Sequence, residues 1–228
     1  MNVREKTIIF STFLSSCLAI SLLGASLGTD NWVESKVYRE ANVKAYGYVH
    51  FGLFKGARQL NHGFGERNYP MDISDIMFHE QKFMNRDLYV TTVAMLIGGI
   101  FFGGLTVILS LLNTASDPRE AVCHFPGLIA LNSLAAICSL TGIATWVAQF
   151  SVRLKTNVLI REDTIKGGWS SEGLSFLGHS FWFVVVGAGL FIINIIIFFI
   201  LKSKRKKRDP LRRQVMESSK PNGNLMLY

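Results

Sequence analysis

Four long apolar runs constrain this chain more than any other feature of its sequence. Each contains 21 to 26 residues and no Asp, Glu, Lys or Arg, and together they occupy 8–28, 88–112, 125–150 and 181–201. At about 1.5 Å rise per residue, each run can cross a hydrocarbon core of about 30 Å as a helix. Only helices and closed barrels satisfy their backbone in lipid, and barrel strands alternate polar with apolar residues. The expected fold class is therefore an all-α membrane protein with a bundle of four transmembrane helices.

The distribution of basic residues predicts the orientation of these spans. The segment 202–228 carries nine of the 24 Lys and Arg residues, whereas 29–87 carries eight basic and eight acidic residues. Basic residues collect in cytoplasmic segments, and an even number of spans places both ends on one side. We therefore expect both termini to lie in the cytoplasm. The expected location is the plasma membrane. The expected cytoplasmic segments are residues 1–7, residues 113–124 and the basic tail at residues 202–228. The expected extracellular segments are residues 29–87 and 151–180.

The first apolar run admits a second interpretation. Arg4 and Lys6 precede it and small residues follow in "GAS", a layout that also describes a secretory signal peptide. The run is longer than the apolar core of a usual signal peptide, which favours an uncleaved anchor. Cleavage would leave three spans, and their orientation would not change.

The basic tail is interpreted as a membrane anchor rather than a nucleic-acid site. Its positive residues begin directly after the fourth run, where each contributes about 1 kcal/mol of attraction to an anionic leaflet. Anionic lipids are therefore the expected contact, and nucleic acid is not. The residues assigned to lipid are Lys202, Lys204, Arg205, Lys206, Lys207 and Arg208. Further on, Met226 and Tyr228 match the terminal pattern that PDZ domains bind, with an unbound end as the alternative.

The segment 29–87 is expected to contain a small β-sheet. "YGYVHFGLFKG" alternates with the period of a strand and has apolar residues on both faces, so we expect it to be buried on both, with Gly52 allowing close approach. We predict two or three strands within 31–54, a turn-rich link at 56–70 and an amphipathic helix at 71–87. Because this segment contains no cysteine, packing and hydrogen bonds must hold it. Apolar spacing predicts that the third span continues as a helix past the bilayer, through Val152, Leu154, Val158 and Leu159.

Small and amide side chains inside the runs are predicted to join the helices. Glycine pairs four residues apart let helix backbones approach closely, and amides hydrogen-bond between helices. The assigned residues are Gly24, Gly28, Gly99, Gly103, Asn132 and Asn194. No charged residue lies inside a run, which disfavours an ion or proton pathway. Five scattered histidines and the lack of catalytic or phosphate-binding motifs lead us to expect no enzyme activity, cofactor or metal site.

Together these pieces resemble the clarin family, tetraspan membrane proteins distantly similar to the claudin and PMP22-like group. The resemblance covers nearly the whole chain and rests on the four-run layout, "FGLFKG", "FPGLIALN" at the start of the third run and "GHSFW" at the start of the fourth. It implies that a claudin-like pattern of tryptophan followed by Gly-Leu-aromatic maps onto Trp32 and onto Gly52, Leu53 and Phe54. It also implies a claudin-like extracellular sheet.

The resemblance further implies non-enzymatic roles in sensory hair-cell bundles, ribbon synapses and actin-linked membrane organisation. The chain departs from other clarins in having no cysteine in 29–87 and no Asn-X-Ser/Thr sequon. Within the family, both departures point to the third vertebrate clarin.

Three hypotheses about function follow. The leading one is a non-enzymatic tetraspan protein that organises membrane or scaffold proteins, using the sheet outside and the basic tail inside. The second is a channel or small-solute transporter subunit, formed as a homo-oligomer, which the lack of charge inside the runs disfavours. The third is a claudin-like adhesion protein, ranked below the first because a disulfide in 29–87 is impossible.

Overall fold

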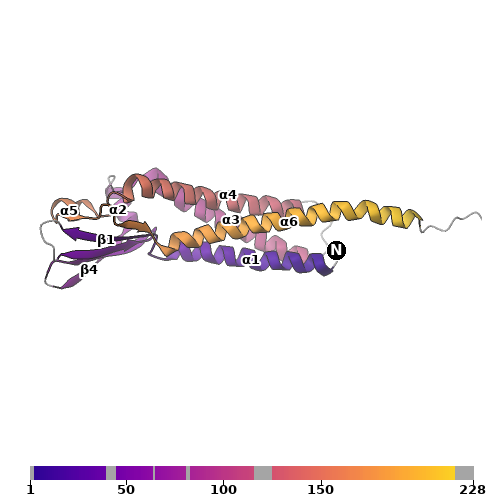
Figure 1. The fold of residues 1–228 in the computed structure, drawn as a ribbon, viewed down its shortest axis with the longest axis horizontal. Helices are drawn as coiled ribbons and strands as arrows, with labels where there is room; N and C mark the ends of the chain where they lie inside the picture. The colour runs from indigo at the N-terminus through magenta and orange to yellow at the C-terminus, as the bar shows by residue number, and fades with distance from the viewer. Residues whose placement is uncertain (1–2, 40–44, 64, 81–82, 116–124, 219–228) are drawn as a thin grey trace, which may run out of the picture.

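A computed structural model describes residues 3–39, 45–63, 65–80, 83–115 and 125–218. It consists of a long bundle of helices with a β-sheet at one end (Figure 1). The four helices of the bundle are α1 (Val3–Gly28), α3 (Arg86–Ala115), α4 (Phe125–Gln149) and α6 (His179–Ser218). All four are long and apolar enough to cross a membrane, which confirms the predicted class of four-span helical protein.

The bundle is antiparallel, with α1 and α4 each packed against both α3 and α6. Buried positions recur at alternating spacings of three and four residues, which is the seven-residue repeat of helices packed as in a coiled coil. On α3 these positions are Tyr89, Thr92, Leu96, Gly99, Gly103, Thr106, Ser110 and Asn113. Most of them are small or hydroxyl-bearing, because close backbone contact and interhelical hydrogen bonds join helices in lipid.

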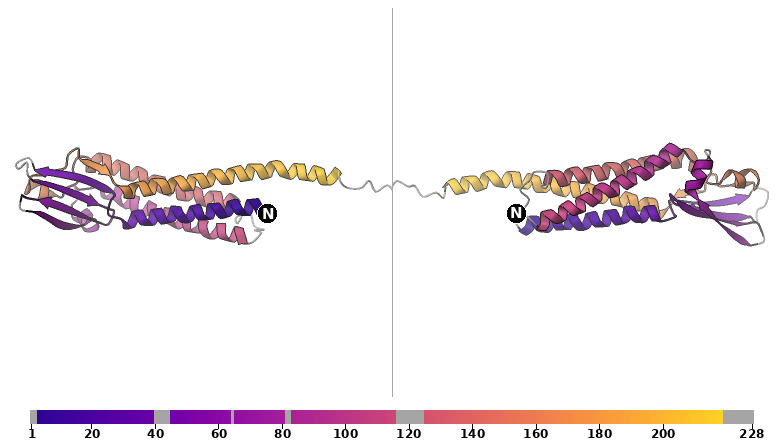
Figure 2. Two further views of the ribbon diagram at one scale, coloured as in Figure 1. Left: turned by 60° about the horizontal axis from the view of Figure 1, so that its bottom comes forward. Right: turned by 180° about the vertical axis from the view of Figure 1, so that it is seen from behind.

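The helix α6 continues well past the ends of its three neighbours, away from the sheet (Figure 2). Its candidate span covers His179–Lys204, and the helix itself extends to Ser218. Lysine and arginine are good helix formers, so the basic segment prolongs the span instead of breaking it.

The sheet is antiparallel, with the order β4-β3-β2-β1-β5, and β6 also pairs with β1. Its strands are β1 (Val33–Arg39), β2 (Tyr46–Phe51), β3 (Lys55–Asn61), β4 (Glu66–Asp72), β5 (Trp169–Ser170) and β6 (Ser175–Leu177). A small sheet following the first span is therefore confirmed. It also recruits two short strands from the segment before α6, which the sequence analysis did not predict.

The expected turn-rich link at 56–70 is wrong, because this segment forms the hairpin of β3 and β4. Only the glycines around residue 63 make the turn, and Gly63 has a φ of 98°. Pro70 lies in β4, which is an edge strand, so its missing N–H costs no ladder hydrogen bond.

Two helix predictions are also corrected. The helix expected over 71–87 is the short α2 (Ile73–His79), whose first turn is capped by the Asp72 carboxylate accepting from the Asp75 N–H at 3.2 Å. The expected continuation of the third span ends after one π-helical turn, η1 (Phe150–Leu154). Its Val158 and Leu159 are buried in the loop that follows, before the short helix α5 (Arg161–Ile165).

Candidate functional site: the junction of sheet and bundle

Trp32 lies at the centre of the junction between the sheet and the bundle. Its side chain is fully buried, and its indole Nε1–H donates to the Ser26 carbonyl at 2.6 Å, which satisfies a carbonyl in the last turn of α1. Its ring meets that of Trp146 of α4 edge to face, with centroids 4.9 Å apart. Its backbone N–H donates to Phe51 at 2.9 Å, and its carbonyl accepts from Gly178 at 2.9 Å. One residue thus joins α1, β2, α4 and the chain entering α6.

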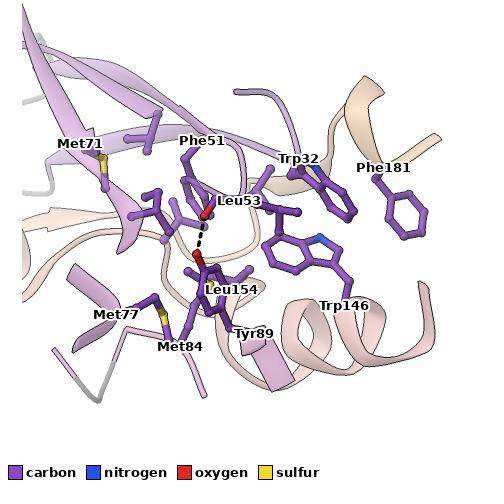
Figure 3. Close-up of a cluster of buried hydrophobic side chains, with 14 of the residues drawn as sticks. Trp32, Phe51, Leu53, Met71, Met77, Met84, Tyr89, Trp146, Leu154 and Phe181 are labelled. Atoms are coloured by element: carbon purple, nitrogen blue, oxygen red, sulfur yellow. Dashed lines mark hydrogen bonds between the residues drawn. The ribbon is translucent and has the colours of Figure 1, made fainter. Parts of the chain in front are cut away.

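The Gly-Leu-aromatic motif forms the turn between β2 and β3, closed by a 2.7 Å hydrogen bond from the Gly52 N–H to the Lys55 carbonyl. A Cβ at Gly52 would collide with the backbone carbonyl of Thr29, just past the end of α1. The Leu53 side chain is buried, and its carbonyl accepts the Tyr89 hydroxyl of α3 at 2.9 Å, drawn dashed in Figure 3. The motif therefore fixes the sheet to two helices of the bundle.

Phe54 differs from its neighbours in this motif. Its carbonyl accepts the Ile73 N–H at 2.9 Å, which ties the turn to the start of α2. Its side chain, however, remains 39% exposed. The backbone of Phe54 thus belongs to the junction, and its ring does not share the burial of Trp32 and Leu53.

A methionine-rich apolar cluster fills the space around these residues (Figure 3). Its side chains come from the sheet, α2, α3, α4 and α6, so sheet and bundle share one core. Unbranched methionines fill irregular gaps well, which suits a seam between a sheet and helix ends. The labelled members are Trp32, Phe51, Leu53, Met71, Met77, Met84, Tyr89, Trp146, Leu154 and Phe181.

The sheet buries one face and leaves the other uncovered. On β2, Val49 and Phe51 are buried against the bundle, whereas Tyr46 is 56% exposed. The expectation that "YGYVHFGLFKG" is buried on both faces is therefore wrong, because only one layer of helices packs on the sheet. In register, Tyr46 pairs with Tyr38 of β1, which is 38% exposed, and Phe176 of β6 is 47% exposed on the same face.

This uncovered face, called here the outer face, carries a shallow hollow and a polar cluster. Its hollow has a volume of about 470 Å³ and is lined by residues that include Tyr38, Tyr46, Gln59 and Glu66. Tyr48 also lines the hollow, and its hydroxyl donates to the Glu34 carboxylate at 2.7 Å. Burial, together with the Glu34 carboxylate, raises the pKa of Tyr48 above its ordinary value, so the phenol stays a donor.

An ion pair attaches the segment between α4 and α6 to the sheet. The Arg58 guanidinium on β3 pairs with the Asp163 carboxylate on α5, and it also lies 5.3 Å above the Tyr69 ring. Burial raises the pKa of Asp163 above its usual range, although the Arg58 charge opposes this shift. Opposite charges on β3 and α5 thus hold together two segments that are far apart in sequence.

The amides assigned to helix packing do meet inside the bundle. The Asn194 Nδ2 donates to the Ser16 hydroxyl at 3.0 Å and to the Asn132 Oδ1 at 3.4 Å, which links α6 to α1 and α4. The Asn132 Nδ2 donates to the Leu128 carbonyl at 2.8 Å within α4.

The two glycine pairs have different surroundings. A Cβ at Gly103 would lie 2.9 Å from the Phe191 ring, and one at Gly99 would lie 3.0 Å from the Ser139 hydroxyl. Close packing therefore occurs at this pair. A Cβ at Gly24 or Gly28 would meet nothing within 4 Å, so these two glycines make no close contact in the described part of the bundle.

The residues assigned to lipid and scaffold contacts are only partly described. Lys202 and Lys204 are exposed on α6. Arg205, Lys206, Lys207 and Arg208 lie on the same helix, and nothing is described of their side chains. Met226 and Tyr228 lie outside the described residues. The lipid and PDZ assignments remain predictions.

Several residues of the junction were not predicted from the sequence, namely Tyr89, Trp146, Phe181, Arg58 and Asp163. The first three are aromatic residues in the first or last turns of apolar runs, a position that could have marked them as interface residues. No local pattern pairs Arg58 with Asp163, because 105 residues separate them. Within the described ranges, no group of three or more His, Cys, Asp and Glu residues is placed to hold a metal ion.

Fold and junction together define a four-span membrane protein whose terminal sheet is packed onto the helix ends. A family model described as Clarin-2, Clarin-2-like, matches residues 4–198. Clarin-3 of Homo sapiens is 24% identical over 232 residues, covering 99% of this chain and all of the relative. Clarin-3 of Rattus norvegicus is 22% identical over 192 residues, covering 81% of this chain and 82% of the relative. The chain therefore belongs to the clarin family.

Proposed function

We propose that this clarin is a non-enzymatic membrane organiser that binds membrane proteins through the outer face of its sheet. The observation that carries the proposal is the outer face itself, where Tyr38, Tyr46 and Phe176 stay exposed on a sheet whose other face is anchored in the bundle. Tyrosine and phenylalanine are enriched in the centres of protein interfaces. A rigid platform also binds partners at a lower entropic cost than a flexible loop.

On the opposite end of the bundle, the basic continuation of α6 is proposed to contact anionic lipids of the cytoplasmic leaflet. Its helical backbone starts directly at the end of the fourth candidate span. Basic residues next to a membrane are attracted to anionic headgroups. A plasma-membrane location with cytoplasmic termini belongs to this proposal, as does the link to actin-rich protrusions that the family resemblance implies.

The outer face is tested with the variant Tyr46→Ser/Phe176→Ser in the full-length chain. Affinity purification from native tissue, with quantitative mass spectrometry, should show that the double variant loses the membrane proteins enriched by the unaltered chain. The matched control is Phe78→Ser, which removes an equally exposed aromatic side chain on α2, away from the outer face. Surface delivery is measured in parallel, and a delivered double variant that keeps every partner contradicts the proposal.

The proposed scaffold contact at the other end of the chain is tested separately, by removing residues 225–228. Proximity labelling from the tail should then lose proteins that contain PDZ domains and keep the partners of the outer face. An unchanged set of labelled proteins would contradict the PDZ assignment. It would not bear on the binding of partners by the outer face.

A further inference from the structure

A second hollow lies where the third candidate span leaves the bilayer. Its volume is about 350 Å³, and η1, α5 and the segment following α2 form its walls. The third candidate span ends at Leu154, so Val152 and Arg153 on the wall of this hollow lie in the last turn of the span. The hollow is therefore at the height where phospholipid headgroups meet the helix ends.

The π-helical turn presents these wall residues to the lipid. The Lys155 N–H donates to the Phe150 carbonyl at 2.8 Å, a bond that spans five residues and widens the helix. Val152 is 66% exposed as a result of its position on this turn, and Arg153 is exposed beside it. An apolar side chain with an adjacent guanidinium is the surface that fits the boundary between acyl chain and headgroup.

The charges of the hollow favour an anion. Arg153 and Arg161 both line it, and within the described part of the chain neither guanidinium takes part in an ion pair. The carboxylate on the wall is Glu80, whose Oε2 accepts the backbone N–H of Arg161 at 3.1 Å, so the lining keeps two positive charges against one negative charge. The planar fork of an arginine matches the oxygens of a phosphate, and two arginines line this hollow.

We propose that this hollow binds the phosphate of a phospholipid in the leaflet next to the sheet. Arg153 and Arg161 hold the phosphate oxygens, and Val152 contacts the start of an acyl chain. Phe83 and Leu159, which are buried, form the apolar back of the hollow. The site belongs to the end of the bundle that carries the sheet, and is separate from the basic continuation of α6.

Native mass spectrometry of the full chain, released from nanodiscs of phosphatidylcholine, tests the site. The unaltered chain should retain phosphatidylcholine, and Arg153→Gln/Arg161→Gln should weaken this binding about tenfold or more, since charge-assisted hydrogen bonds are lost. The control is Lys36→Gln on the outer face, which removes a positive charge away from this hollow and should bind as the unaltered chain does. Diacylglycerol with the same acyl chains lacks the phosphate and should not be retained.

Photolabelling of the unaltered chain tests the site without relying on the folding of the double variant. A photoreactive phosphatidylcholine should label the unaltered chain within residues 152–165. Labelling elsewhere only, equal retention of diacylglycerol, or displacement of the lipid by millimolar inorganic phosphate overturns the proposal. Dimers that persist without any bound lipid and are lost in the double variant also overturn it, because a second copy then occupies the hollow.

Discussion

At the scale of single residues, the junction depends on backbone groups as much as on side chains. Gly52, Leu53 and Phe54 are adjacent, and each binds a different part of the molecule: the end of α1, α3 and α2, respectively. The sequence alone indicated that Gly52 permits close approach, and it could not show that the Phe54 ring stays partly exposed.

Gly52→Ala should therefore destabilise the protein more than Phe54→Asp does. The new methyl group would meet the backbone of Thr29 and Asp30, which cannot move without distorting the end of α1. We expect a loss of about 1–3 kcal/mol, as for other overpacked sites, and reduced surface delivery. Surface biotinylation and thermal unfolding followed by tryptophan fluorescence measure both effects. Gly24→Ala, where a Cβ meets nothing within 4 Å, is the control, and equal behaviour of the two alanine variants would refute the assignment.

The Arg58–Asp163 pair predicts a pH-dependent change in stability. Arg58→Gln leaves a partly buried carboxylate without its partner and should cost about 1–3 kcal/mol at neutral pH. Burial already holds the pKa of Asp163 above its usual range, and removal of the opposing Arg58 charge raises it further. The folded variant then binds the proton more tightly than the unfolded chain, so its deficit should shrink as pH falls through that raised pKa.

Thermal unfolding of Arg58→Gln and of Arg58→Gln/Asp163→Asn between pH 7 and pH 4.5 measures this dependence. The double variant should recover part of the lost stability at neutral pH and lose the pH dependence. A deficit of Arg58→Gln that grows on acidification would contradict the account of Asp163.

At the scale of elements, the apolar runs predicted the bundle helices well, because lipid permits few alternatives for 20 uncharged residues. Prediction failed where pairing partners decide the structure. The segment of β3 and β4 contains glycines and Pro70, and only its position at the sheet edge makes it a hairpin. Likewise, β5 and β6 are two and three residues long, too short to leave a pattern in the sequence.

The glycine pairs give a prediction about helix packing. Gly103→Val places new methyl groups against Phe191 and Ile20, and should lower stability by about 1–3 kcal/mol. Gly24→Val should leave the thermal unfolding of the monomer unchanged, because among the described residues no heavy atom lies within 4 Å of a Cβ at this position. Differential scanning fluorimetry in detergent compares the two variants. The packing assignment fails if Gly24→Val proves as damaging as Gly103→Val.

At the scale of the whole molecule, sheet and bundle form one body with a shared core. Large buried side chains fill the interior of the bundle near the sheet, including Leu23, Leu96, Trp146 and Val184. Further from the sheet, Asn194 bonds to Ser16 and Asn132, and a second apolar cluster follows, formed by Ile9, Leu128, Phe198 and Leu201. The apolar end of the bundle packs against the sheet and fixes its position.

Purified protein in liposomes should consequently give no ion or solute flux above empty liposomes. Asn194→Leu should lower stability by about 1 kcal/mol, the usual scale for an interhelical hydrogen bond in a membrane. Flux by the unaltered chain that disappears in Asn194→Leu would favour the transporter hypothesis instead.

Site-specific photo-crosslinking in cells tests whether the outer face of the sheet binds membrane proteins. A photoreactive amino acid replaces Tyr46 on the outer face in one variant and the equally exposed Phe78 on α2 in another. We expect defined protein adducts from position 46 that position 78 does not form, with both variants delivered to the cell surface. Identical adducts from the two positions, or none from position 46 in a delivered protein, would contradict it.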